Sequence, residues 1–209
     1  IRRLYYSENP LDLFPLSFLT SYDPTLELAR EVSTIVMLVT VAMLATVATV
    51  YPGFLIAALS VQVSAEFEVT EATYGWGLGS FFLAATVASA PAGRLAQRIG
   101  PRRQMAGALL VSAVAQLALA MVAPSFVAVL VCLVLAGLVN AAMQTAVNLS
   151  ISSAQLSRLG LAVSLKQSAM PTASLISGLA VPVFALTIGW RWAFGVGAAW
   201  TLLVALLVW

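Results

Sequence analysis

Long apolar segments constrain this chain more than any other feature. Six of them follow one another, each close to the roughly 20 residues that a helix needs to cross about 30 Å of hydrocarbon. A membrane barrel would instead need strands of alternating hydrophobicity, and these segments are apolar throughout. A mean hydropathy of +1.00 and 9% charged residues point the same way. We therefore predict an all-α membrane protein with six transmembrane helices, at residues 35–59, 74–90, 104–122, 126–149, 160–186 and 192–209.

The first 31 residues differ in composition from the rest. They combine acidic side chains with arginines, and Pro10, Pro15 and Pro24 should interrupt any long helix there. They lack the pattern of a removable signal peptide. We predict a polar, cytoplasmic tail at 1–31 and a six-helix transmembrane bundle at 32–209. Because the chain opens on Ile1 and stops within an apolar run, we expect it to be a fragment.

The positions of the ten basic residues predict the orientation. If the N terminus is cytoplasmic, only Arg191 lies in an outside loop, and Lys166 lies within the fifth span. All the others then fall in cytoplasmic segments, as the positive-inside rule requires. These eight residues are Arg2, Arg3, Arg30, Arg94, Arg98, Arg102, Arg103 and Arg158.

The segment GRLAQRIGPRR, residues 93–103, forms the predicted cytoplasmic turn between the second and third spans. Gly93 and Gly100 permit backbone conformations or close approaches that a side chain would block. Arg94 and Arg98 lie four residues apart and so share one helical face. We interpret the segment as a helix end, a short amphipathic turn and a restart near Pro101. The alternative is an ordinary arginine-rich loop that only anchors the topology.

This segment resembles the signature loop of the major facilitator superfamily of secondary transporters, Gly-x-Leu-Ala-Asp-Arg-x-Gly-Arg-Arg. One departure is Gln97, which stands where the family has aspartate, so a latch built on that carboxylate cannot form a salt bridge here. Leu161 to Phe194 is also similar to the fifth helix and the start of the sixth in bacterial members. The matching residues of the loop are Gly93, Leu95, Ala96, Arg98, Gly100, Arg102 and Arg103.

The resemblance implies a fold of two six-helix bundles, of which this chain is the N-terminal one. The partner that it lacks is then the C-terminal six-helix half, and the expected location is a bacterial inner (plasma) membrane. Each bundle of this family contains a 3+3 inverted repeat. The short segments Ile99–Arg102 and Ile188–Arg191 are consistent with such a repeat, since they share isoleucine, glycine and arginine.

Small residues at four-residue spacing predict how the helices pack, because lipid gives apolar helices little reason to associate. Gly75 and Gly79 form such a pair in the second span. Gly178, with Ser174, and Gly195, with Ala199, repeat the spacing in the fifth and sixth spans. We expect these pairs to lie at helix contacts.

Polar residues inside the spans are the candidates for solute contact, since each is costly in hydrocarbon unless it faces a partner or a cavity. Asn140, Gln144 and Asn148 lie at four-residue steps and so share one face of the fourth span. Hydrogen bonding between helices would explain them equally well. Tyr51 lies in the first span beside Pro52, which removes a backbone donor and leaves a carbonyl free to bind another group.

Lys166 is the only charged residue within the six predicted spans. About six residues into the fifth span, it would lie roughly 9 Å from the cytoplasmic end. One interpretation is that its long stem lets the ammonium reach the inner headgroups. The other is that Lys166 and Gln167 face the cavity and attract an anionic or carboxylate-bearing substrate.

Composition argues against an enzyme, a cofactor and a metal site. The chain has no histidine, and its one cysteine, Cys132, lies in the fourth span, where it has no cysteine partner. A serine–histidine dyad and a histidine metal site are therefore impossible. A net charge of +2, with basic residues explained by topology, makes nucleic-acid binding improbable on composition.

We therefore predict a secondary active transporter of a small solute that works by alternating access, with an anionic or carboxylate-bearing substrate as the favoured class. Its partners are the small-molecule substrate, the lipid bilayer and the C-terminal half. Two alternatives remain, a drug or metabolite efflux antiporter and a truncated scaffold that does not transport. Efflux is disfavoured because Leu133 stands where drug antiporters often carry arginine, and only Pro171 remains of their fifth-helix motif.

Overall fold

The computed structural model describes residues 24–121, 123–154, 156 and 158–209. The chain divides into two units, Ile1–Val36 and Met37–Trp209. The described part of the first unit is helical and forms the beginning of α2, Pro24–Ala58. Most of the predicted polar tail, 1–31, lies outside the described residues. Its last eight residues are helical and belong to α2.

The described part of the second unit is helical throughout, without strands. The predicted all-α class is therefore confirmed. After α2 the chain forms α3 (Ser60–Phe67), α4 (Glu71–Ile99), α5 (Pro101–Met121), α6 (Phe126–Ser153), α7 (Leu159–Gln167), α8 (Ala169–Ala180), the π-helix η2 (Val181–Ala185) and α9 (Trp190–Val208).

Five helical stretches in the described residues are long and apolar enough to cross a membrane: Val32–Ala58, Pro101–Met121, Phe126–Ser153, Leu159–Ala185 and Trp190–Val208. The predicted span 74–90 lies in α4, which is not among them. With 29 residues, α4 reaches about 43 Å, so its length suffices. Its glycines, serines and threonines lower its hydropathy, and this separates it from the other five.

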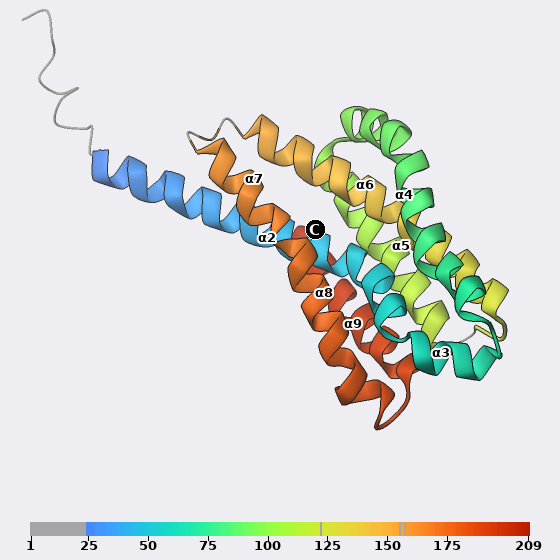
Figure 1. The fold of residues 1–209 in the computed structure, drawn as a ribbon. Helices are drawn as coiled ribbons and strands as arrows, with labels where there is room; N and C mark the ends of the chain where they lie inside the picture. Colours follow the sequence, from blue (N-terminus) through green and yellow to red (C-terminus); the bar gives the residue numbers. More distant parts are fainter. Residues whose placement is uncertain (1–23, 122, 155, 157) are drawn as a thin grey trace, which may run out of the picture. The chain divides into compact units, whose positions relative to one another are not determined.

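Within this unit α6 packs against both α4 and α5, and α5 packs against α9 (Figure 1). α4 and α6 approach each other closely at Gly137, where an added Cβ would overlap the backbone carbonyl of Phe81. Three of the glycines that were predicted to lie at helix contacts do not lie there. A Cβ at Gly75, Gly79 or Gly178 would meet nothing within 4 Å, so these glycines are not at contacts between the described helices.

Prolines lie at a released carbonyl in the first span and near a helix break in the fifth. Pro52 lies inside α2, and the carbonyl four residues before it, on Ala48, accepts hydrogen bonds from Gln116 Nε2 (3.4 Å) and Thr201 Oγ1 (3.5 Å). Pro171 follows the break between α7 and α8, where Ser168 separates the two helices. Each proline withholds an N–H from its helix, so the freed backbone group binds elsewhere or the helix breaks.

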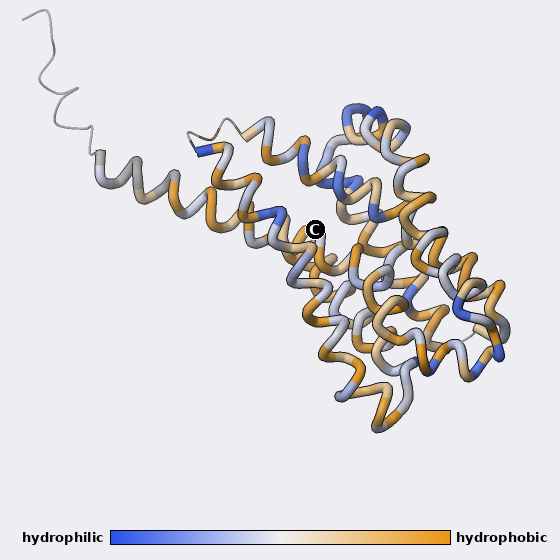
Figure 2. Tube along the Cα trace, viewed as in Figure 1, coloured by the Kyte–Doolittle hydropathy of each residue, from blue (hydrophilic) through white to orange (hydrophobic). Residues whose placement is uncertain are grey.

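Two of the connections between helices contain a glycine with positive φ. α4 ends at Ile99 and α5 begins at Pro101, so only Gly100, with φ of +86°, lies between them. Gly189 precedes α9 with φ of +107°. A side chain is strained at such angles, which explains glycine at both places. Figure 2 shows apolar residues over most of the helices and hydrophilic residues gathered at the α4–α5 turn.

Candidate functional site

Lys166 lies at the C-terminal end of α7 and is only 2% exposed. Its ammonium donates hydrogen bonds to Oε1 of Gln144 on α6 and to Oε1 of Gln167, the latter at 3.2 Å. The structure thus brings together three of the predicted solute-contacting residues. The side chain lies against α6 and is covered by protein.

Asn140 on α6 and Thr46 on α2 are further buried polar residues. Asn140 is one helical turn from Gln144, and its Oδ1 accepts a hydrogen bond of 3.4 Å from Thr49 Oγ1. Gln144 Nε2 and Thr46 Oγ1 are buried and have no hydrogen-bond partner among the described residues. Asn148, the third residue of the predicted stripe, is exposed. The stripe therefore enters the interior at Asn140 and Gln144 only.

This cluster has no negatively charged group among the described residues. Lys166 contributes a positive charge when it is protonated, and Gln144 contributes an N–H donor that has no partner among the described residues. In the described part of the chain the one ion pair joins Arg191 to Glu66, so no described carboxylate neutralises Lys166. No group of three or more histidine, cysteine, aspartate or glutamate residues in that part could hold a metal ion. Such an arrangement suits the binding of a small anion.

Tyr51 lies apart from this cluster. Its hydroxyl donates to the carbonyl of Ala193 on α9 at 3.3 Å. A Cβ at Gly197 would lie 2.6 Å from Cε1 of the Tyr51 ring, so glycine is needed where α9 passes it. The ring lines an apolar pocket of about 370 Å³ between α2, α8, η2 and α9. The structure therefore places Tyr51 in helix packing, away from Lys166, Gln144 and Gln167.

The predicted signature loop is mostly helix. Residues 93–99 form the last turns of α4, and a Cβ at Gly93 would only touch Thr145 at 4.0 Å, so the expected special role of this glycine is wrong. Gly100 alone has the unusual backbone angle. The side chains of Leu95, Gln97, Arg98 and Arg103 are exposed.

Arg102 is the member of the loop that contacts a distant helix. Its Nε donates to the carbonyl of Val208 at 3.0 Å, and its Nη2 donates to the carbonyl of Trp209. Arg102 therefore links the α4–α5 turn to the backbone of α9.

Two buried glutamines on α5 carry the interhelical hydrogen bonds that the sequence analysis did not single out. Gln104 Nε2 donates to the carbonyls of Ala92 (3.0 Å) and Ala142 (2.9 Å), and so links α4 to α6. Gln116 Nε2 donates to Thr201 Oγ1 at 2.9 Å as well as to Ala48 of α2. The available signal was two glutamines within an otherwise apolar run, where a polar side chain is costly without a partner.

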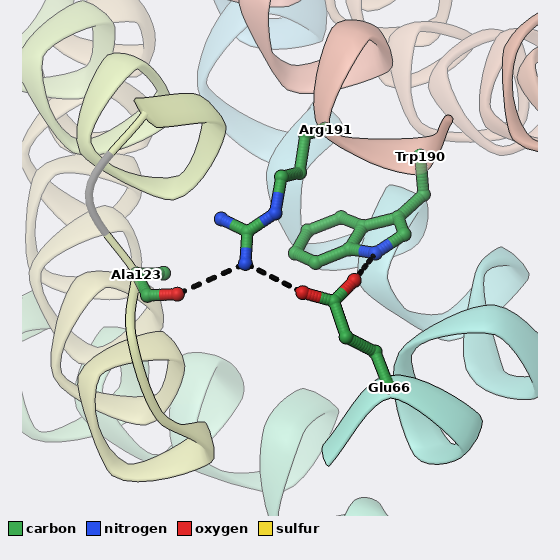
Figure 3. A network of polar contacts seen from close by, with 4 residues as sticks. All are labelled: Glu66, Ala123, Trp190 and Arg191. Carbon is green, nitrogen blue, oxygen red and sulfur yellow. Dashed lines mark hydrogen bonds and ion pairs between the residues drawn. The ribbon is translucent and has the colours of Figure 1, made fainter. Parts of the chain in front are cut away.

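At the other end of the unit a polar network joins α3, the α5–α6 loop and α9 (Figure 3). Nη2 of Arg191 donates to Glu66 Oε1 at 2.7 Å and to the carbonyl of Ala123 at 3.0 Å. The indole of Trp190 donates to Glu66 Oε2, and the Arg191 guanidinium lies 4.8 Å from the Trp190 ring centroid. α3, the α5–α6 loop and the start of α9 therefore meet on one face.

Opposing effects act on the pKa of Glu66. Partial burial of the carboxylate raises it, but the hydrogen bonds from Arg191 and Trp190 and the charge of Arg191 together bring the pKa below its usual value. Glu66 is therefore ionised at neutral pH and holds the network as a carboxylate.

The comparisons with known proteins agree with this architecture. A search of curated proteins gave no match. The family model described as Major Facilitator Superfamily matches residues 32–209, well over half of the chain. With its apolar helices, the arginine-rich α4–α5 turn and its buried polar residues between helices, the chain belongs to the major facilitator superfamily of membrane transporters.

Proposed function

We propose that this chain is the N-terminal six-helix half of a secondary active transporter that moves a small anionic or carboxylate-bearing solute by alternating access. In this proposal a C-terminal six-helix half completes the transporter. The N terminus lies in the cytoplasm and the membrane is the bacterial inner membrane. The solute crosses unchanged, so the chain is not an enzyme and needs no cofactor.

The observation that carries this proposal is the environment of Lys166. Its ammonium is buried, and its described partners are two neutral amide oxygens. Removing an ion from water costs roughly several kcal/mol of free energy. Neutral partners offset only part of this cost. An anionic solute would supply the missing opposite charge. Gln144 Nε2, buried without a partner, would then donate to the same solute.

Breaks in the helices support a moving site. Lys166 and Gln167 end α7, directly before the interruption at Ser168. Discontinuous helices of transporters commonly place solute sites at such interruptions. A small rotation of α8 relative to α7 would change what faces Lys166 without breaking a continuous helix. Solute binding and helix movement are thereby linked at one place.

Matched pairs of small solutes test the proposal. The full-length transporter, which includes the C-terminal half, is reconstituted in liposomes and assayed for uptake of lactate and lactamide, succinate and succinamide, and benzoate and benzamide. The two members of each pair are close in shape and differ in charge. We expect at least one carboxylate to enter about tenfold faster than its amide, since a charged hydrogen bond contributes roughly 1.5–3 kcal/mol.

Liposomes without protein give the background for each solute. Equal uptake of every carboxylate and its amide, both above background, would show transport without charge selection and would overturn the anionic class. Uptake at background for all solutes by the full-length transporter would contradict transport of small carboxylates.

A further inference from the structure

A groove of about 660 Å³ lies between α5 and α9, away from Lys166. Gly195 forms its floor with Ala120, because a Cβ at Gly195 would lie only 3.9 Å from the Ala120 methyl group. Leu117 and Met121 of α5 form one wall, and Trp192 of α9 stands on the other side. Small residues between large ones leave room for a narrow apolar occupant.

The end of the groove nearest the start of α9 is polar. Arg191 lines it there, at the start of α9, beside Trp192. Arginine and tryptophan at the end of a membrane helix are typical of the headgroup level of a bilayer. From Arg191 to Ala199 the helix rises about 12 Å, so the floor of the groove descends from the headgroups into the hydrocarbon.

Arg191 retains donors for a third acceptor. Both of its acceptors in the described part of the chain, Glu66 Oε1 and the Ala123 carbonyl, are contacted by Nη2 (Figure 3). A guanidinium carries five N–H groups, so those of Nε and Nη1 remain for a ligand. Phosphate oxygens are suitable partners for such a fork. The Glu66 ion pair keeps the side chain in place at the mouth of the groove.

The walls indicate what lies below the phosphate. Leu117 is 46% exposed, Met121 72% and Trp192 61%, although all belong to membrane-spanning stretches. Further along α9, beyond Ala199, exposed apolar side chains such as Leu203 continue the surface. Hydrocarbon is the solvent at this depth, and the groove offers it a narrow apolar channel. We propose that this groove binds one phospholipid, with its phosphate on Arg191 and an acyl chain over Gly195 and Ala199.

Native mass spectrometry of the full chain with palmitoyl-oleoyl phosphatidylglycerol tests the acyl-chain part. Ala199 is exposed, so Ala199→Phe fills the groove without disturbing the core. Leu203→Phe, one turn further along the same helix face, is the matched control. We expect one retained lipid in the unmodified chain and in Leu203→Phe, and about tenfold lower occupancy in Ala199→Phe. Equal occupancy in all three would overturn the proposal.

The headgroup part needs a lipid without phosphate. Dioleoylglycerol should be retained about tenfold less than the phosphatidylglycerol, because it lacks the charged hydrogen bonds to Arg191. Arg191→Gln should remove this difference, whereas Glu66→Gln, which leaves the guanidinium, should keep it. Equal retention of the two lipids by the unmodified chain would overturn the assignment of Arg191.

Two further results would contradict a membrane lipid as the occupant. Displacement of the lipid by millimolar inorganic phosphate would identify a free-phosphate site. A dimer that Ala199→Phe dissociates would show that a second copy of the chain covers the groove. We expect a monomer at this face and no displacement, because the acyl chain supplies most of the contact.

Discussion

Arg102 and Arg191 hold the two ends of one antiparallel helix pair in reciprocal fashion. Arg102 is the second residue of α5 and donates to carbonyls at the end of α9. Arg191 is the second residue of α9 and donates to the carbonyl of Ala123, just beyond the end of α5. Each arginine follows a glycine of positive φ, Gly100 or Gly189. The two arginines therefore connect α5 and α9 near both ends of α5.

Arg102 should contribute more to stability than its neighbour Arg103, although both are exposed arginines on the same turn. Loss of the hydrogen bonds to the α9 carbonyls in Arg102→Gln should cost about 0.5–1.5 kcal/mol. Thermal unfolding in one detergent compares this variant with Arg103→Gln, which should match the unmodified chain. A larger loss in Arg103→Gln would contradict this role of Arg102.

Glu66 should make stability depend on pH in the acidic range. Its pKa in the folded chain is below the ordinary value, so its contribution is complete above the unfolded value of about 4.3 and is lost as pH falls through the folded value. The pair is exposed and screened, so the effect is at most about 1 kcal/mol. Unfolding temperatures from neutral to acidic pH should fall less for Glu66→Gln than for Glu68→Gln. Parallel curves for the two variants would refute this role of Glu66.

Gly137 should not tolerate even one methyl group. Its Cβ would overlap the Phe81 backbone and lie 3.1 Å from the Ala84 methyl, so α4 and α6 would have to separate. Gly137→Ala should destabilise the chain by about 1–3 kcal/mol. Gly75→Ala and Gly79→Ala, where a Cβ meets nothing within 4 Å, should be neutral or stabilising by up to about 1 kcal/mol. The unfolding midpoints of the three variants decide the point. Similar losses in all three would place these glycines at equivalent contacts.

Gln116 and Pro52 should be coupled through the Ala48 carbonyl. Gln116→Met removes a donor from that carbonyl and should cost about 1–3 kcal/mol. In Pro52→Ala the helix regains its own N–H donor, so the same substitution should cost less. A double-mutant cycle on the free energy of unfolding measures the difference. Strict additivity would mean that the two residues do not share this carbonyl.

Much of the fold follows from the sequence, because apolar length and proline are strong local signals. Predicted spans such as 104–122 and 126–149 lie within a few residues of α5 and α6. The prediction for α4 was weaker, since its glycines and serines reduce the hydropathy on which the assignment depends. The carbonyl that Pro52 was expected to leave without a helical donor is that of Ala48, and it accepts a hydrogen bond from Gln116.

Side-chain partners were harder to predict, because they depend on how the helices pack. Spacing placed Asn140 and Gln144 on one face, but only the packing of α7 against α6 brings Lys166 to Gln144. Four-residue spacing of glycines also occurs where a helix is exposed, as at Gly75, so it does not identify contacts. The partner of Glu66 lies 125 residues away, and no local pattern indicates such a pairing.

Substitution of Lys166 tests the proposed solute site most directly. For a carboxylate that the liposome assay finds to be transported, the account predicts that Lys166→Gln raises KM at least about tenfold, whereas Lys166→Arg largely keeps the affinity. Asn148→Ala, on the exposed part of the same α6 stripe, serves as the control and should leave KM unchanged. An unchanged KM in Lys166→Gln would mean that the charge of Lys166 does not bind the solute.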